Sequence, residues 1–223
     1  MNAAPVVIVA GDSSDSRGLI ASMLIAEPCH IVEARDGATV LDLVGRHTGD
    51  LVLIETYMDD LDGLEVCRRL RKDGDNRMLP IVMISAMDDM ASRVAAINAG
   101  ADDFLSKPIE RNELIARVRS LLKMKSMRDR LEDARQVIFA LANAAEAKDL
   151  FTVEHTARVA DSASALARRL GLPSDVVEQI RVGGLIHDVG KLAVPDVVLN
   201  KPAALTAAEF ELVKSHTDRK SVV

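Results

Sequence analysis

Hydrophobic and polar residues follow two alternating patterns along the first half of the chain. Short continuous apolar runs are separated by longer segments in which apolar residues recur every three or four positions. The first pattern is typical of buried parallel strands and the second of helices that pack on a sheet. The predicted strands are residues 6–9, 30–34, 51–54, 80–85 and 102–106. This alternation predicts an α/β domain with a five-stranded, doubly wound parallel sheet, whose ligand site lies at the carboxyl ends of the strands.

The second half of the chain is predicted to be helical. Residues 111–165 contain neither glycine nor proline, the residues that most disfavour a helix interior. Apolar residues there follow the alternating three- and four-residue spacing of a two-helix contact. The members of this seam are Met124, Met127, Leu131, Ala134, Ile138, Leu141 and Ala145. The pattern predicts a linker helix over residues 124–142. This helix either packs on its own domain or joins two copies in a parallel coiled coil, and the regular seam favours the homodimer.

Shorter helices are predicted beyond the linker. Their ranges are residues 152–170, 174–186 and 206–215. Gly171 suits the left-handed position after a helix, and Ser174, following Pro173, is predicted to cap the next helix. Thr206 and Glu209 have the spacing of a capping box. The second half is therefore predicted to form an all-α domain.

Composition narrows the classes of protein that fit these elements. The 223 residues suit two modest domains, and with 48% hydrophobic but only 2% aromatic residues their cores must be aliphatic. A net charge of −6 without a basic block argues against nucleic acid as a partner. Cys29 and Cys67 lack metal-ligand spacing and indicate reduced thiols in a cytoplasmic protein. We expect no signal peptide and no membrane-spanning segment.

Candidate chemistry is concentrated in residues 185–206, LIHDVGKLAVPDVVLNKPAALT. His187 and Asp188 are adjacent at the end of an apolar helix, and Lys191 follows one turn later. Imidazole and carboxylate ligands together suit Zn, Fe, Mn or a similar divalent ion. An unpaired charge in this apolar run would be costly, so the pair is predicted to hold a metal.

This segment resembles the HD superfamily of metal-dependent phosphohydrolases, and in particular its HD-GYP branch, which hydrolyses cyclic dimeric GMP. The matching residues are HDVGK, Pro195-Asp196, Lys201-Pro202, Leu205-Thr206, His155-Thr156-Ala157-Arg158-Val159 and Lys214-Ser215-His216. The resemblance implies that His155, His187, Asp188 and His216 are metal ligands, and that Asp188 and Lys191 take part in catalysis, with Lys191 contacting a phosphate oxygen. Some relatives have a further carboxylate four residues before the first histidine. That position is Phe151 here, which disfavours a third metal ion.

The resemblance stops shortly after His216. The GYP signature, two more histidines and a final aspartate would follow in the family, but residues 218–223, DRKSVV, do not match. Back-translated, this segment matches a sequencing-adapter read-through. We therefore expect residues 143–217 to be the N-terminal part of an HD-GYP domain and residues 218–223 to be a non-native tail. We also expect the chain by itself to be weak or inactive as an enzyme, with any bound ion held weakly.

The first half resembles a response-regulator receiver domain over about residues 6–123, which we assign to a domain of residues 1–123. The matching residues are Asp62-Gly63-Leu64-Glu65, Ser85-Ala86, Ala99-Gly100-Ala101-Asp102-Asp103-Phe104 and Ser106-Lys107-Pro108. The resemblance implies a phosphoacceptor aspartate at the end of the third strand. It also implies Mg²⁺ held by two acidic residues after the first strand. Ser85 would lie at this site, and a cis Lys107–Pro108 peptide would aim Lys107 at it.

The acceptor site departs from the receiver pattern. Glu55 stands at the acceptor position, and Ala10 and Gly11 stand where the acidic pair is expected. Asp12 comes one residue late. A site without that pair should hold Mg²⁺ poorly, because the ion needs carboxylate oxygens. We therefore predict a receiver without phosphotransfer, in which Glu55 reaches Lys107. The contact either mimics an activated state or is a simple buried ion pair.

Three functions fit the sequence. The first is a two-component response regulator of the cyclic dimeric GMP phosphodiesterase type, with a sensor kinase or other signalling protein as partner. The second is a non-catalytic signalling and dimerisation module that binds a protein. The third is an HD hydrolase for another phosphoester, against which the Lys201-Pro202 and Leu205-Thr206 matches argue.

Overall fold

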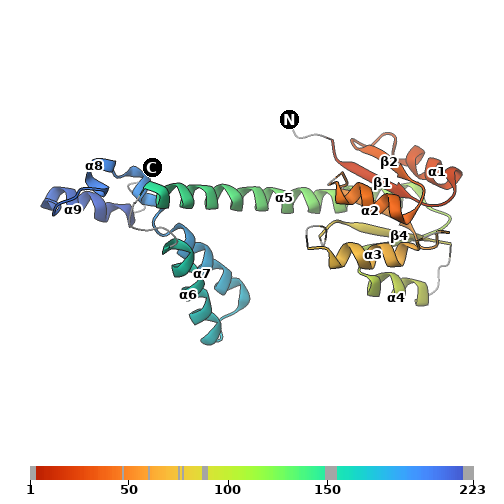
Figure 1. Cartoon of the computed structure of the whole chain (residues 1–223). Coiled ribbons are helices and arrows are strands. Elements are labelled where there is room, and N and C mark those ends of the chain that lie inside the picture. Colours follow the sequence, from red (N-terminus) through yellow and green to blue (C-terminus); the bar gives the residue numbers. More distant parts are fainter. Residues whose placement is uncertain are drawn as a thin grey trace. The chain divides into compact units, whose positions relative to one another are not determined.

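The structure is a computed structural model that describes residues 4–46, 48–59, 61–74, 76, 78–86, 90–148 and 155–217 (Figure 1). The chain divides into two compact units, Met1–Asp129 and Arg130–Val223. The division falls inside the predicted linker of residues 124–142. Among the described helices, none combines the length and the apolar character needed to cross a membrane.

The first unit is built on a parallel sheet, which confirms the predicted fold class. In the described part of the chain its five strands have the order β2-β1-β3-β4-β5. The strands are β1 (Val6–Ala10), β2 (His30–Ala34), β3 (Leu51–Glu55), β4 (Ile81–Ser85) and β5 (Asp103–Ser106). The helices are α1 (Ser14–Leu24), α2 (Gly37–Gly45), α3 (Gly63–Lys72), α4 (Met90–Ala99) and α5 (Arg111–Lys148). The predicted strands differ from these by at most one residue at either end.

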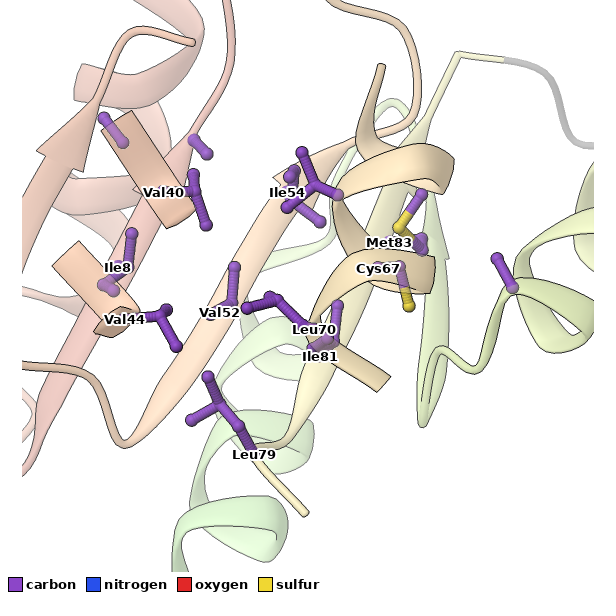
Figure 2. Packing of buried hydrophobic residues seen from close by; sticks show 14 of the residues in the cluster. Ile8, Val40, Val44, Val52, Ile54, Cys67, Leu70, Leu79, Ile81 and Met83 are labelled. Carbon is purple, nitrogen blue, oxygen red and sulfur yellow. The ribbon is translucent and has the colours of Figure 1, made fainter. Parts of the chain in front are cut away.

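Alternate residues of the strands point into two aliphatic cores. Ile8 contributes to the core under α2 and α3, together with Val40, Val44, Cys67 and Leu70, whose packing Figure 2 shows. Val7 points the other way and packs with residues of α1 and α5, namely Ile20, Leu24, Leu114 and Val118. Both faces of the sheet are therefore covered, as continuous apolar strands require.

Both cysteines are free thiols. Cys67 lies in the first core, where burial raises the pKa of its thiol. Cys29 is half-buried, and desolvation likewise raises the pKa of its thiol, with a smaller contribution from the Glu27 carboxylate. A thiol with a raised pKa is mostly protonated and unreactive near neutral pH.

The second unit is helical in the part that the structure describes. It contains the end of α5, then α6 (His155–Arg169), α7 (Ser174–Ile186), α8 (Asp196–Leu199) and α9 (Ala207–Lys214). Two short 3₁₀ segments, η1 (Val189–Ala193) and η2 (Ser215–Thr217), precede α8 and follow α9. The helices α6 and α7 pack against each other as a hairpin (Figure 1).

The ends of these helices test the predicted caps. Gly171 has a φ of +72°, and the amides of Gly171 and Leu172 donate to Arg168 and Ala167, which is a Schellman motif. The capping box of Thr206 and Glu209 is also confirmed. The prediction for Ser174 is wrong: Pro173 is the N-cap and makes no side-chain cap, while Ser174 is the first helical residue.

Two other helix predictions need adjustment. The helix predicted over residues 206–215 is α9, with Thr206 outside it as the N-cap. The helix predicted over residues 152–170 is described from His155 to Arg169. Phe151 and the predicted tail 218–223 lie outside the described residues.

The helix α5 is continuous over 38 residues. Met124, Met127 and Leu131 of its predicted seam are 52%, 58% and 68% exposed. Beyond them, Ile138 faces a small cavity that it lines together with Val182 and Leu185 of α7. Leu141, on the other side of Ile138, is 46% exposed, so the seam is open on both sides of residue 138.

Candidate functional site

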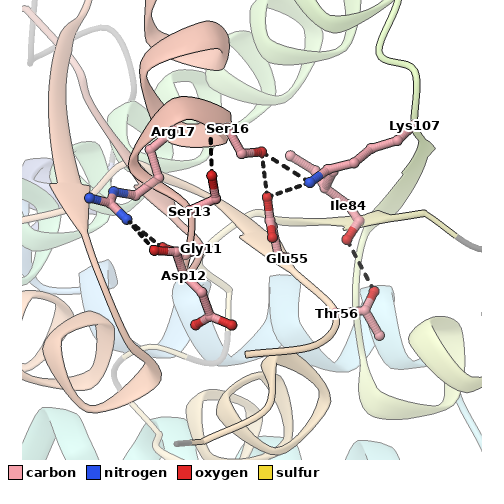
Figure 3. Close-up of polar contacts among 9 residues, drawn as sticks. All are labelled: Gly11, Asp12, Ser13, Ser16, Arg17, Glu55, Thr56, Ile84 and Lys107. Carbon is pink, nitrogen blue, oxygen red and sulfur yellow. Dashed lines mark hydrogen bonds and ion pairs between the residues drawn. The ribbon is translucent and has the colours of Figure 1, made fainter. Parts of the chain in front are cut away.

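The acceptor position of the receiver is part of a three-residue polar cluster. Glu55 ends β3 with its side chain 13% exposed, and its Oε1 accepts 2.6 Å hydrogen bonds from Lys107 Nζ and Ser16 Oγ (Figure 3). Lys107 Nζ also donates to Ser16 Oγ over 3.0 Å. The predicted reach of Glu55 to Lys107 is therefore present, and the Lys107–Pro108 peptide is cis.

Ser16 is a member that the sequence analysis missed. It lies in the first turn of α1, whose N-cap is Ser13. A serine in a first helical turn is common, so no distinct sequence pattern marks this residue. Only the fold brings residue 16 within reach of residues 55 and 107.

Gly11 makes room for the longer acceptor side chain. A Cβ at residue 11 would lie 2.7 Å from Cδ of Glu55, closer than side chains approach each other. Ala10, the neighbouring residue, is buried at the end of β1. Neither Ala10 nor Gly11 supplies a carboxylate, and the Glu55 side chain fills the space beside Gly11.

The other polar side chains near Glu55 form hydrogen bonds with neighbouring residues of the receiver. Asp12 is exposed, and its Oδ2 accepts from the amide of Asp59 over 3.0 Å. Arg17 Nη1 donates to the backbone oxygens of Gly11 and Asp12 over 2.7 and 3.1 Å (Figure 3). Ser85 is buried at the end of β4, next to Ile84, whose oxygen accepts from Thr56. Arg17 therefore bonds to the backbone at one position of the expected acidic pair, and Lys107 bonds to the side chain at the acceptor position.

The second candidate site is formed where α6, α7, η1 and η2 meet. His155 is the first described residue of α6, His187 is the C-cap of α7, and Asp188 precedes η1. The rings of His155 and His187 are 5.6 Å apart at 61°. One ligand atom from each of these three residues lies within 4.8 Å of the other two.

Asp188 is the centre of this cluster. Its Oδ2 is 2.8 Å from Lys191 Nζ and 3.4 Å from His187 Nε2, while Oδ1 is 3.5 Å from Nε2 of His216. The Asp188 and Lys191 side chains are both 15% exposed. The fold thus groups His155, His187 and Asp188 as candidate ligands. His216 lies outside that group and, like Lys191, contacts the Asp188 carboxylate.

Backbone carbonyls orient two of the imidazole rings. His187 Nδ1 donates to the oxygen of Gly184 over 2.8 Å, and His216 Nδ1 donates to the oxygen of Val213 over 2.5 Å. A carbonyl only accepts hydrogen bonds, so Nδ1 carries the proton in both rings. In the neutral form of each ring the lone pair is then on Nε2, the nitrogen that faces Asp188. This is the second-shell arrangement found around metal-binding histidines.

These residues fit a divalent ion. Nitrogen and oxygen ligands at about 2.0–2.2 Å from one ion lie roughly 3–4 Å apart. The candidate ligand atoms, within 4.8 Å of one another, need to move by about an ångström or less to reach that spacing. Within the described ranges this is the one group of three or more His, Cys, Asp or Glu residues with such geometry.

Family models match both halves of the chain. Residues 7–119 match the response regulator receiver domain, and residues 152–219 match the HD domain. The chain belongs to the response regulator receiver family, with an HD domain following the receiver.

Among known proteins, the chain is similar to enzymes of cyclic di-GMP signalling. It is 32% identical to RpfG, a cyclic di-GMP phosphodiesterase response regulator of Xanthomonas campestris pv. campestris, over 94% of this chain and 61% of that protein. It is 27% identical to a probable cyclic di-GMP phosphodiesterase of Vibrio cholerae, over 94% of this chain and 54% of that protein. The chain thus spans little more than half the length of these relatives.

Solved receiver domains share the fold of the first unit. A receiver domain of a Francisella response regulator is 32% identical with a TM-score of 0.50, and covers 54% of this chain and 98% of its own. A receiver domain from Vibrio parahaemolyticus is 25% identical with a TM-score of 0.54, and covers 57% of this chain and 97% of its own.

Proposed function

We propose that this chain is a response regulator of the cyclic di-GMP phosphodiesterase type, whose HD domain binds a divalent ion through His155, His187, Asp188 and His216. The observation that carries the proposal is the convergence of these side chains from α6, α7 and η2 on the Asp188 carboxylate. The names of the relatives supply the substrate class, a cyclic dinucleotide. A ligand set of imidazoles and one carboxylate favours Fe, Mn or Zn.

Each side chain then has a defined task in phosphodiester hydrolysis. A bound ion supplies Lewis-acid polarisation of the phosphoryl oxygen and lowers the pKa of water. His187 and His216 present Nε2 while backbone oxygens hold their Nδ1 atoms, so these two rings are oriented before an ion binds. Lys191 places an ammonium beside the ligands, where it acts as a point charge for a phosphate oxygen.

In the receiver, we propose a pocket that does not carry out Mg²⁺-dependent phosphotransfer. Glu55 is engaged by Lys107 and Ser16, and the carboxylates that would hold the ion are replaced by Ala10 and Gly11. The input signal would then be contact with a kinase or another signalling protein rather than phosphorylation. The two free thiols support a cytoplasmic location for the protein and its signalling partner.

The seam of α5 supports a homodimer. Met124, Met127 and Leu131 expose more than half of their surface and follow the spacing of a two-helix contact. A second copy is the proposed occupant, because a parallel pair of α5 helices would bury the same three residues of each chain against one another.

The test is metal content together with turnover. The chain is purified and its metal stoichiometry is measured beside His187→Ala, with His30→Ala as the control because His30 is exposed on β2. We expect the metal to be lost in His187→Ala only. Because this chain is expected to be weak or inactive by itself, any cyclic di-GMP hydrolysis should be slow and should be lost together with the metal. Hydrolysis that persists in metal-free protein would contradict the proposal.

A non-catalytic signalling module is the second candidate. It is favoured by the filled receiver pocket and by the exposed seam, neither of which needs the HD site. Absence of metal from the wild-type chain, together with stable dimerisation, would support this candidate over the first.

A further inference from the structure

Two glycines lie where the segments that carry the candidate ligands touch backbone to backbone. Gly184 is in α7, three residues before His187, and Gly190 is in η1, two residues after Asp188. In the described chain only Gly100 and Gly171 have a positive φ angle. The backbone conformation at residues 184 and 190 therefore does not require glycine. They are glycine because a side chain would have no space.

Gly190 contacts the backbone of His216. A Cβ at residue 190 would lie 2.0 Å from the His216 oxygen and 2.8 Å from its carbonyl carbon, whereas ordinary contacts begin at 3.4 Å. No rotamer change can relieve a clash with backbone. Because η2 is only three residues long, it is the segment expected to move. Its movement would carry His216 Nε2 away from Asp188.

Gly184 contacts the backbone of α6. A Cβ at residue 184 would lie 2.7 Å from Cα of Ala160, a residue with no exposed surface. Relief requires α6 and α7 to separate near the end that carries His155. The same glycine also supplies the oxygen that orients the His187 ring.

We propose that Gly184 and Gly190 are positioning residues that set the distances between the metal ligands. Gly184 holds His155 against His187, and Gly190 holds His216 against Asp188. This inference rests on the proposed metal site. It states that two residues that are not ligands determine the geometry of that site.

Gly183 provides a matched control. It is adjacent to Gly184 in the same helix, but a Cβ there would meet no atom within 4 Å. Gly183→Ala introduces the same methyl group into α7 without a clash, and it raises helix propensity. Its metal affinity is expected to stay within about twofold of the wild type.

The first experiment measures the affinity of the full chain for Mn²⁺ and for Zn²⁺ by titration. Gly184→Ala and Gly190→Ala are each expected to weaken binding about 10- to 100-fold, the range for loss of an outer-shell contact. In a His216→Ala background, Gly190→Ala should add less than about a twofold loss, because its effect passes through His216. Independent, additive losses would overturn the assignment for Gly190.

The second experiment needs no metal. Ring resonances of the histidines in metal-free protein are expected to shift for His216 in Gly190→Ala, and for His155 and His187 in Gly184→Ala. If wild type binds neither ion, the proposed function fails, but these spectra still decide whether the glycines position the rings. Unchanged His216 resonances in Gly190→Ala, or equal shifts in Gly183→Ala, would overturn the inference. If Gly184→Ala does not fold, Gly190→Ala, which displaces only η2, provides the decision.

Discussion

At the scale of single residues, the receiver pocket shows how one methylene group is accommodated. Glu55 is longer than the aspartate that the receiver family places there, and Gly11 leaves free the volume that its side chain enters. The two residues are a matched pair, since a larger residue 11 and a glutamate at 55 cannot both occupy this space. The sequence revealed the two departures separately but not that they compensate each other.

This compensation predicts a coupling between the two positions. Gly11→Ala is expected to destabilise the wild type by about 1–3 kcal/mol, because it pushes Glu55 away from Lys107 and overpacks the pocket. In a Glu55→Asp background the same substitution should cost less, because the shorter side chain leaves room. Denaturant unfolding of the four proteins measures the coupling, and equal costs in both backgrounds would show that the positions are independent.

At the scale of helices and strands, local signals were predicted well, and long-range contacts were predicted only where a motif indicated them, as for Glu55 and Lys107. The capping box of α9 and the left-handed Gly171 follow from residue types a few positions apart. Ser174 was predicted as the cap because serine is a good N-cap. Pro173, with an extended ψ of 149°, is the last residue before the helix and therefore takes the N-cap position. Ser16 in the receiver pocket and the His216–Gly190 contact depend on the tertiary fold, which no local pattern reveals.

The capping box of α9 predicts a pH dependence. Hydrogen bonds from Lys201 and from the Thr206 amide and hydroxyl lower the pKa of Glu209 to about 2. Because the folded-state pKa lies below the ordinary value of 4.5, the stabilisation is complete above pH 4.5 and is lost as the pH falls toward 2. A carboxyl NMR titration is expected to show the Glu209 midpoint well below those of exposed glutamates. Lys201→Met should raise this midpoint, and an unchanged midpoint would contradict the role of Lys201.

The end of α5 predicts a local change in stability. Lys148 Nζ donates to the backbone oxygens of Leu192 and Val194, and Asn200 Nδ2 donates to the Lys148 oxygen over 3.0 Å. Lys148→Met removes the charged donor and leaves these two carbonyls without it. Amide hydrogen exchange in η1 and α8 is expected to become about tenfold faster, equivalent to roughly 1.4 kcal/mol. Lys123→Met, an exposed lysine of the same helix, is the control. Equal protection in both variants would show that Lys148 does not hold this segment.

At the scale of the whole molecule, α5 is the covalent connection between the receiver and the HD domain. Its 38 residues correspond to about 57 Å of helix. The first unit holds it through Lys125, 3.2 Å from Asp50, and through Arg128, which donates to the Met78 oxygen over 2.6 Å. The family of each unit could be predicted from motifs, but these helix contacts could not, because Lys125 and Arg128 have no distinguishing sequence pattern.

The proposed dimer predicts a difference between two exposed positions of α5. Leu131→Glu puts a charge on the seam and is expected to convert the dimer to a monomer in light-scattering measurements. Val137→Glu changes a residue of similar exposure, 60% against 68%, that is outside the seam, and should leave the dimer intact. A monomeric wild type, or dissociation by both substitutions, would contradict a dimer through this seam.

The contact between Lys191 and Asp188 affects how readily the proposed metal site of the HD domain takes up an ion. In the metal-free protein the Lys191 ammonium lies 2.8 Å from the Asp188 carboxylate and balances its charge. At the proposed metal site, an incoming ion would compete with this internal cation, and its apparent affinity would be lower than that of the same ligands alone. Occupancy of the site would then follow the free metal concentration, and the output of the protein would depend on metal supply as well as on its input signal.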